Sequence, residues 1–483
     1  MGVFNSSLWK LLIGGIMNKS LITEPLGLFG WTHLEPVILA ALATESPMLL
    51  IGKHGAAKSF LLERLAEALN LEFRCYNASL INYDDLVGIP IPVNNNTSLD
   101  YISNPNSIWN AEVLFVDEIN RTKPELQNKL FPIIYDKRVQ GQKLEKLRYR
   151  WSAMNPPSNN DEDEEDELNY YGASPLDPAL ADRFPFLVEV PSWDELSDED
   201  RKKMLFDAHE GRHEFPVNIH SLIEQTKTHI QEVLTNEKEK AVEYIVFLMS
   251  VASESLGYIS ARRATMLLKT LVAIIAANRT LQDYGCKEES FSDDVCIHIQ
   301  NTIPNVANKH IDKTVLVNIA LQALKIANLE DDIERSIFRI KDPVEKVKFA
   351  INHSNKLEAS LICDVITTSV ASIPNPFRRA LALVCYLSFR KRSDIYAAVM
   401  ETLLSEIRPV LNLKSSKQLC QLSKRKIADK VVEALHGIDR RTKYFSYINN
   451  LLYSFLPDGY NSEEEPSKLL AFLIRTMKDV ELL

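Results

Sequence analysis

The first part of the chain alternates strand-length apolar runs with helical periodicities. Continuous rather than alternating hydrophobicity is typical of strands that are buried on both faces of a parallel sheet. Helical patterns separate the runs, and this order predicts a doubly wound α/β domain with five parallel strands that ends near Pro191. The strand candidates are residues 47–51, 72–76, 113–116, 149–154 and 186–190.

Helical periodicity dominates the chain after Trp193, and no further strand is expected there. One apolar stripe consists of Val315, Ile319, Ala323 and Ile326, which we interpret as ordinary helix packing. We therefore predict an all-α lid and an all-α C-terminal region, whose role the sequence leaves open. The predicted divisions are an N-terminal extension at 1–30, the α/β nucleotide-binding domain at 31–193, the lid at 194–289 and the C-terminal region at 290–483.

Two insertions and one charged run interrupt the α/β pattern. Residues 84–107 are rich in Asn and Pro, and residues 138–144 have the alternation and central glycine of a hairpin. Residues 161–167 are entirely acidic, which favours a solvated loop. A contact of this run with a basic partner or pore is the alternative interpretation.

Composition limits the class of protein. The chain of 483 residues has a net charge of -10, which argues against a basic surface for duplex DNA and makes nucleic acid an unlikely partner. Its six cysteines show no CxxC pair and no zinc-ligand spacing, which indicates a reducing compartment and a cytoplasmic location. No apolar run reaches the roughly eighteen residues that cross a bilayer, so we expect no membrane span.

The first residues leave the start of the chain open. Gly2 and Ser6 fit a loose myristoylation pattern, whereas Lys10 interrupts the apolar run that a signal peptide needs. Met17 is an alternative start. We expect neither a lipid anchor nor a leader from these patterns.

A glycine-containing loop lies between the first predicted strand and the helix that follows it. Such a loop at a helix N-terminus clusters backbone N–H groups, which several phosphate oxygens require together. Lys58 would contact the β- and γ-phosphates, and the Ser59 hydroxyl would coordinate Mg²⁺. Glycine usually precedes this lysine, and we expect Ala57 to lie already in the first helical turn, where alanine costs little. The loop consists of Gly52, Lys53, His54, Gly55, Ala56, Ala57, Lys58 and Ser59.

Two adjacent acids follow the third predicted strand. Asp117 would support the metal ion, and Glu118 would polarise an attacking water. In a doubly wound sheet the ligand lies at the carboxyl ends of the strands, so this pair and the glycine loop should share one crevice. The sequence therefore predicts a site that binds a nucleoside triphosphate, ATP, with Mg²⁺ and hydrolyses it.

Four motifs follow one another in the first part of the chain. They are Gly-x-x-Gly-x-Ala-Lys-Ser at 52–59, Val-Asp-Glu-Ile-Asn-Arg at 116–121, Ala-Met-Asn-Pro at 153–156 and Leu-Ala-Asp-Arg-Phe at 180–184. In this order they resemble the motifs of the MoxR-type AAA+ ATPases, in the helix-2-insert group of P-loop NTPases. The resemblance covers about residues 20–285, and alanine before the loop lysine is common in that family. Asp85-Leu86 followed by Gly88 is similar to the family's insert after the second strand.

The resemblance implies roles for three further residues. Asn155 corresponds to the sensor that orients the attacking water, and Arg183 to an arginine finger that acts on the nucleotide of a neighbouring subunit. Arg262 matches the family's Ser-x-Arg motif, although Arg263 stands beside it. The alternatives are a turn residue before proline for Asn155, an ion pair with Asp182 for Arg183, and a solvated helix charge for Arg262.

By resemblance, ATP is hydrolysed at the subunit interfaces of a ring homo-oligomer, with a hexamer as the expected form. The energy would remodel protein complexes in a chaperone-like role, with a client that contains a von Willebrand factor A domain. Two alternatives stay open from the sequence: a DNA-dependent motor, and a scaffold that ATP switches with little turnover.

Overall fold

The structure is a computed structural model of the chain. It describes residues 19–93, 98–102, 106–122, 124–156, 176–210, 217–286, 288–412, 425–436, 438–456, 460, 462 and 464–483. The N-terminal patterns around Gly2 and the acidic run at 161–167 lie outside the described residues. The chain divides into two compact units, Met1–Asn328 and Leu329–Leu483, and each is described by itself.

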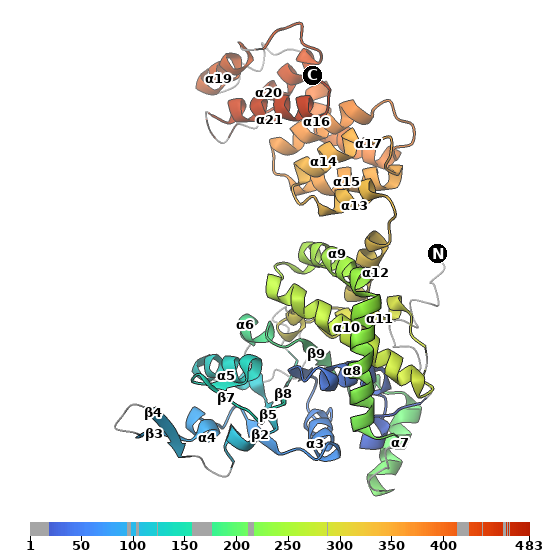
Figure 1. Cartoon of the computed structure of the whole chain (residues 1–483). Coiled ribbons are helices and arrows are strands. Elements are labelled where there is room, and N and C mark those ends of the chain that lie inside the picture. The colour runs from blue at the N-terminus through green and yellow to red at the C-terminus, as the bar shows by residue number, and fades with distance from the viewer. Residues whose placement is uncertain are drawn as a thin grey trace. The chain divides into compact units, whose positions relative to one another are not determined.

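A five-stranded parallel sheet forms the centre of the first unit (Figure 1). Its strand order is β2-β5-β8-β1-β9, so the first strand of the chain lies inside the sheet. All five predicted strands are confirmed. Four of them are apolar runs that are buried because helices cover the sheet, whereas β2 lies at an edge of the sheet and is only partly buried. The strands are β1 (Met48–Ile51), β2 (Phe73–Asn77), β5 (Val113–Asp117), β8 (Tyr149–Met154) and β9 (Phe186–Glu189).

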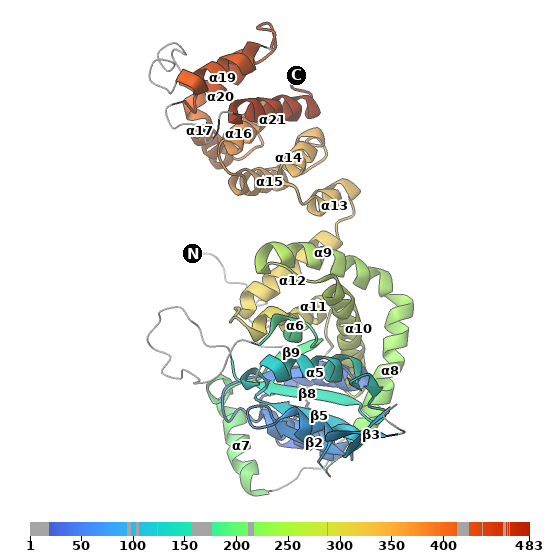
Figure 2. The same ribbon diagram turned by 90° about the vertical axis from the view of Figure 1, so that its left-hand side faces the viewer.

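Helices alternate with these strands, and Figure 2 shows the sheet from the side of α5. Helix α3 starts directly after the glycine loop, and α5 follows the acidic pair. The hairpin expected at 138–144 is present as antiparallel β6 and β7. These elements are η1 (Glu24–Leu26), η2 (Thr32–Leu34), α2 (Glu35–Ala43), α3 (Lys58–Ala68), η4 (Ile119–Arg121), α5 (Pro124–Asp136), β6 (Arg138–Val139), β7 (Gln142–Lys143) and α6 (Pro178–Ala181).

The Asn- and Pro-rich insertion contains a short helix and a second hairpin. Strand β3 (Ile89–Val93) pairs antiparallel with β4 (Ser98–Ile102), between α4 (Tyr83–Val87) and η3 (Ile108–Asn110). The sequence did not predict these strands, because proline removes a ladder donor and argues against a strand assignment. A two-stranded ribbon can accommodate proline, since each of its strands has an edge without a neighbour.

Helices α8 to α12 of the first unit pack on one another, and α8 and α10 also pack on α2. Helices α8 and α10 share one apolar core with α2 and the sheet. Helices α11 and α12, which lie in the region assigned from sequence to 290–483, pack on α9 and α10 within this first unit. The elements are η5 (Trp193–Glu195), α7 (Asp198–Glu210), α8 (Ile219–Asn236), α9 (Lys238–Leu256), α10 (Ala261–Asp283), α11 (Phe291–Gln300), η6 (Pro304–Ala307) and α12 (Lys313–Ala327).

Of the described helices, α10 is long and apolar enough to cross a bilayer. Most of its apolar stretch is buried, which is the pattern of a core helix in a folded domain. Its contacts with α2, α8, α9 and α11 account for this burial.

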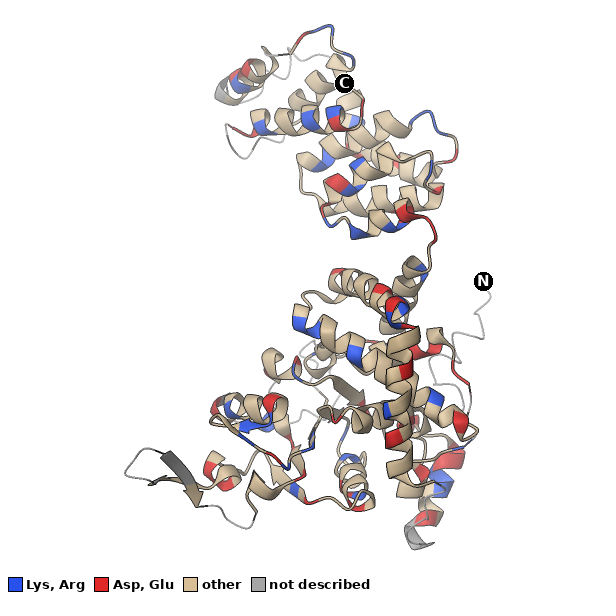
Figure 3. Cartoon of the chain, viewed as in Figure 1, with Lys and Arg blue, Asp and Glu red and all other residues tan. Residues whose placement is uncertain are grey.

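The second unit is all-helical in its described residues, as predicted for the end of the chain. Its helices enclose a separate apolar core. In Figure 3, acidic and basic residues are interspersed over the helices of both units. The helices are α13 (Asp332–Arg339), α14 (Pro343–Asn352), α15 (Ala359–Ser372), α16 (Phe377–Phe389), α17 (Ala397–Leu411), α19 (Arg425–His436), α20 (Phe445–Tyr453) and α21 (Glu465–Asp479).

A buried carboxylate attaches the first described segment to α2. Glu35 is fully buried and accepts hydrogen bonds from the backbone N–H groups of Leu21, Ile22 and Thr23 at 3.0, 2.9 and 2.7 Å. The Thr23 hydroxyl donates to the same carboxylate at 2.9 Å. Because these donors are buried, the carboxylate satisfies groups that would otherwise lose their hydrogen bonds to water.

We expect Glu35→Ala to lower the free energy of unfolding by about 3 kcal/mol or more, since three backbone donors are orphaned at roughly 1 kcal/mol or more each. Chemical denaturation of the full chain measures the change. Glu239→Ala, at an exposed position on α9, is the matched control and should change it by less than about 0.5 kcal/mol. Equal stabilities of the two variants would contradict the proposed role of Glu35.

Candidate functional site

The glycine loop between β1 and α3 has a strained backbone. A Cβ atom on Gly52 would lie 2.4 Å from Cγ2 of Val190, so no side chain fits there. Gly55 has φ of 75°, a left-handed conformation that glycine adopts without steric cost. Both glycines therefore meet a geometric requirement of the loop.

Ala57 adopts a conformation that the sequence analysis did not anticipate. It is the N-cap of α3 at φ 55° and ψ 22°, rather than a residue of the first helical turn. Alanine costs little at this position only within the helix, and Ala57 does not lie within it. A left-handed conformation costs an L-residue with a Cβ about 1–2 kcal/mol, so Ala57 retains strain that glycine would relieve.

The Lys58 side chain crosses the mouth of the loop. Its Nζ donates to the carbonyl oxygens of Gly52 at 2.7 Å and Lys53 at 3.0 Å, and lies 3.4 Å from Oδ1 of Asn155. Burial lowers the pKa of Lys58, and the negative charges of Asp117 and Glu118 oppose this shift. An anion that enters the loop would further stabilise the charged ammonium.

Ser59 and Asp117 bring two oxygen ligands together. The Ser59 hydroxyl donates to Oδ2 of Asp117 at 3.1 Å. Mg²⁺ prefers hard oxygen ligands and usually takes one or two carboxylates, with phosphate and water completing the octahedron. No cluster of three or more His, Cys, Asp or Glu ligands occurs in the described part of the chain. The hydroxyl and the single carboxylate therefore fit Mg²⁺ that is bound together with a phosphate ligand.

Glu118 is held from two sides. Asn77 Nδ2 donates to its Oε2 at 3.3 Å, and Arg121 Nη1 lies 3.2 Å from its Oε1. Its backbone is left-handed, at φ 52°, and its N–H donates to Oδ1 of Asp117 at 2.9 Å. These contacts fix the direction of the carboxylate at the end of β5.

Sequence reasoning missed Asn77 and Arg121. Asn77 ends β2 and pairs in register with Asp117 of β5, so it lies beside the acidic pair. An Asn immediately after the predicted strand at 72–76 was the available signal, and its relevance depended on knowing that β2 and β5 are neighbours. Arg121 belonged to a recognised motif without a role of its own.

Asn155 lies between the loop and the acidic pair. Its Oδ1 faces Lys58, and its Nδ2 lies 3.3 Å from Nε2 of His54. Asn155 therefore has partners for both ends of its amide.

Six of the eight predicted loop residues converge with the acidic pair and Asn155 on one cavity, whereas Gly52 and Lys53 are outside its lining. Its volume is about 280 Å³, and its lining includes Lys58, Ser59, Asp117, Glu118 and Asn155. These residues follow β1, β5 and β8, whose carboxyl ends lie at the same edge of the sheet. The predicted crevice is therefore present, whereas Arg183 and Arg262 are outside its lining.

The two predicted arginines lie along α5 instead. The Arg183 guanidinium is 4.4 Å from the ring centre of Phe131, and Arg262 is 5.7 Å from that of Tyr135, one helical turn further on. Arg262 is about half exposed, and its Nη1 is 4.0 Å from Oδ2 of Asp182. Both guanidinium groups are thus held against aromatic rings on the same helix.

The neighbouring Arg263 has a structural environment. It is fully buried, and it donates to Oδ1 of Asp182 at 3.3 Å and to the carbonyl oxygens of Phe184 and Ala181 at 2.9 and 3.2 Å. Burial lowers its pKa to about 10, and Asp182 opposes this shift. Ser260 also donates to Asp182, at 2.9 Å. Arg263 therefore attaches the start of α10 to the turn before β9, and Arg262 is the arginine that faces solvent.

Residues 47–184 match the family model of the AAA domain (dynein-related subfamily). A solved structure described as "a putative ATPase" from Cytophaga hutchinsonii is similar to this chain at 19% sequence identity and a TM-score of 0.40, over 53% of this chain and 79% of that one. No curated protein matches the chain. The matched segment contains the glycine loop, the acidic pair and Asn155, and it forms an AAA domain with the P-loop fold.

We expect Ala57→Gly to raise the free energy of unfolding by about 1 kcal/mol, because glycine removes the left-handed strain. Thermal and chemical unfolding without nucleotide measure the change. Ala56→Gly is the matched control, since Ala56 lacks a positive φ and its replacement should be neutral or destabilising. A destabilised Ala57→Gly protein would show that the loop does not hold this conformation in solution.

Proposed function

We propose that this protein is an AAA+ ATPase of the MoxR type, which binds ATP with Mg²⁺ and hydrolyses it between subunits of a ring. The proposal rests on the positions of two groups of residues within one chain. The residues for phosphate, metal and water activation share a cavity, whereas the two arginines lie outside it. Since transition-state charge needs a cation, a neighbouring subunit would complete the site.

Each residue of the cavity then has a chemical task. The loop N–H groups and Lys58 would hold the β- and γ-phosphates, and Ser59 with Asp117 would hold Mg²⁺. The metal ion supplies charge neutralisation between the two phosphates. Glu118, oriented by Asn77 and Arg121, would accept a proton from the attacking water, and Asn155 would orient that water.

Arg183 would reach the nucleotide of the next subunit, and Arg262 would reach a nucleotide in its own or in the next subunit. Stacking on Phe131 and Tyr135 restricts both long side chains before assembly, which lowers the entropy lost when they bind phosphate. The family resemblance adds the expected hexamer, the chaperone-like role in the cytoplasm and a client with a von Willebrand factor A domain. The described helices after α12 would recruit that client.

We expect Lys58→Ala to abolish ATP binding, because the phosphates lose their fixed counter-ion. Glu118→Gln should bind ATP with Mg²⁺ and hydrolyse it slowly, since the amide cannot accept the proton. Titration with a fluorescent ATP analogue and steady-state turnover measure the two effects separately. Normal turnover by Glu118→Gln would refute the role of Glu118, and normal binding by Lys58→Ala would refute the phosphate site.

We expect Arg183→Ala to lower kcat by about a thousandfold or more while ATP binding persists, as for a residue that acts in the transition state. Mixing this variant with Glu118→Gln should restore part of the turnover, because some mixed interfaces combine an intact Glu118 with an intact Arg183. Arg138→Ala, at an exposed position of the β6–β7 hairpin, is the control. Unchanged turnover, or absence of rescue in co-assembled protein, would refute action between subunits.

A further inference from the structure

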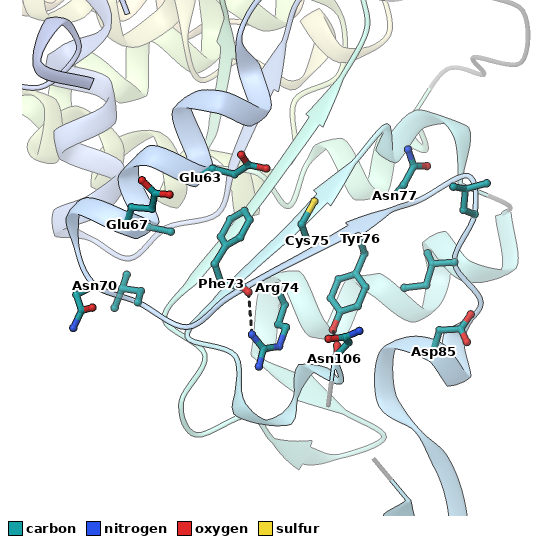
Figure 4. A pocket seen from close by; sticks show the side chains of 14 residues that line it. Glu63, Glu67, Asn70, Phe73, Arg74, Cys75, Tyr76, Asn77, Asp85 and Asn106 are labelled. Carbon is teal, nitrogen blue, oxygen red and sulfur yellow. Dashed lines mark hydrogen bonds between the residues drawn. The ribbon is translucent and has the colours of Figure 1, made fainter. Parts of the chain in front are cut away.

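A groove of about 1210 Å³ runs along β2, the strand at one edge of the sheet (Figure 4). Its lining contains none of the glycine-loop residues. Glu63 and Glu67 of α3 lie on one side of it, and Asp85 of α4 lies near its other end. The groove is thus separate from the nucleotide cavity, whose lining contains no residue of β2.

Every second residue of β2 points its backbone N–H and C=O groups away from β5, toward the groove. The Glu72 carbonyl accepts from Val113 of β5, and the Ala78 N–H donates to Asp117. Because bonded residues alternate in a parallel ladder, the backbone groups of Phe73, Cys75 and Asn77 point away from β5.

Some of these outward groups already have partners. Arg74 Nη1 donates to the Phe73 carbonyl at 3.1 Å, and the Asn77 carbonyl accepts from Leu80 and Ile81. The N–H groups of Phe73, Cys75 and Asn77 and the Cys75 carbonyl have no hydrogen-bond partner within the described part of the chain. An added β-strand can form hydrogen bonds with backbone donors and an acceptor at this spacing.

The walls of the groove favour a positively charged and partly apolar occupant. Three carboxylates, those of Glu63, Glu67 and Asp85, line it against the guanidinium of Arg74, which pairs with Glu72 at 3.3 Å. Glu67 also pairs with Arg64 at 3.3 Å, and Asp85 accepts from the Asn82 N–H at 2.9 Å. Leu80, also in the lining, is 81% exposed. Cys75 is exposed in the groove, and partial desolvation with the charges of Asp117 and Glu63 raises the pKa of its thiol to about 11, so the thiol adds no charge of its own at neutral pH.

The faces of β2 indicate where each kind of side chain would lie. Phe73 and Cys75 point toward α3 and its carboxylates, whereas Tyr76 points to the opposite side, toward Asn106 (Figure 4). Side chains of a paired strand alternate between the same two faces. Basic residues of an occupant would therefore lie by Glu63 and Glu67, and its apolar residues by Tyr76.

We propose that the groove binds an extended segment of a partner protein, in which basic and apolar residues alternate, as a sixth strand on the β2 edge. Backbone hydrogen bonds to Phe73, Cys75 and Asn77 fix the segment in place, and Glu63 and Glu67 select its charge. This binding does not require ATP hydrolysis, so it can be tested apart from the function proposed above.

The test uses the full-length protein and a fluorescein-labelled decapeptide of alternating lysine and valine. A decapeptide of alternating glutamate and valine should bind at least tenfold more weakly. Cys75→Pro removes one outward N–H without touching the β5 ladder, and it should weaken lysine–valine binding at least tenfold. Cys75→Ala keeps the N–H and should bind as the wild type does. Hydrogen exchange should show protection of the amides of Phe73, Cys75 and Asn77 by the peptide.

If the Cys75→Pro substitution disturbs folding, a charge variant tests the same proposal. Glu63→Lys should weaken lysine–valine binding severalfold at low salt, whereas Glu239→Lys, on the exposed face of α9, should leave it unchanged. Retained binding of a fluorescent ATP analogue by both groove variants shows that the domain is folded and keeps the result distinct from the nucleotide function.

Two results would overturn the proposal. One is equal peptide binding by the wild type and Cys75→Pro, or protection of amides away from β2. The other is a loss of self-association in Cys75→Pro with no change in peptide binding, which would identify the edge as an interface between copies of this chain.

Discussion

Parallel register is the constraint on which the rest of the nucleotide site depends. Met154 lies opposite Ile51, and Asn77 lies opposite Asp117. Since Val116 of β5 lies opposite Ser152 of β8, the four strands end within one residue of the same level. Polar residues at or just beyond these strand ends therefore meet, although they are up to 101 residues apart in the chain. A shift of one residue in any pairing would turn these side chains to the other face of the sheet.

Structural features that the local sequence pattern determines were predicted, whereas features that depend on adjacent strands or on a whole loop were missed. Four strands were recognisable because apolar runs of that length need burial on both faces, and β2 because it completes a strand–helix–strand unit. Lys58, Ser59, Asp117 and Glu118 followed from the ends of two strands. Asn77 was missed because the adjacency of β2 and β5 cannot be read from either strand. The strain at Ala57 was missed because backbone direction at a helix start depends on the whole loop. The β3–β4 ribbon was missed because its prolines argue against a strand.

Arg262 and Arg263 belong to the same sequence motif but make different contacts. From sequence, Arg262 and Arg263 are equivalent neighbours of Ser260. In the structure their environments differ. Arg263 donates hydrogen bonds to Asp182 and to two carbonyl groups, whereas Arg262 is about half exposed and lies over Tyr135. Burial thus separates the residue that holds the fold from the one that can meet a ligand. Arg183, on the same side of α5, adds a second cation to that surface.

The shared core of the sheet, α2, α8 and α10 has a mechanical consequence. Helices α8 and α10 bury Leu222 and Ile274 in the same apolar cluster as Leu50 of β1. Close-packed cores transmit displacement rather than absorb it, because they contain few voids into which side chains can relax. If a bound ligand displaced the glycine loop, helices α8 and α10 would therefore move together with the sheet as one rigid body. A hinge for such a movement would lie outside this core.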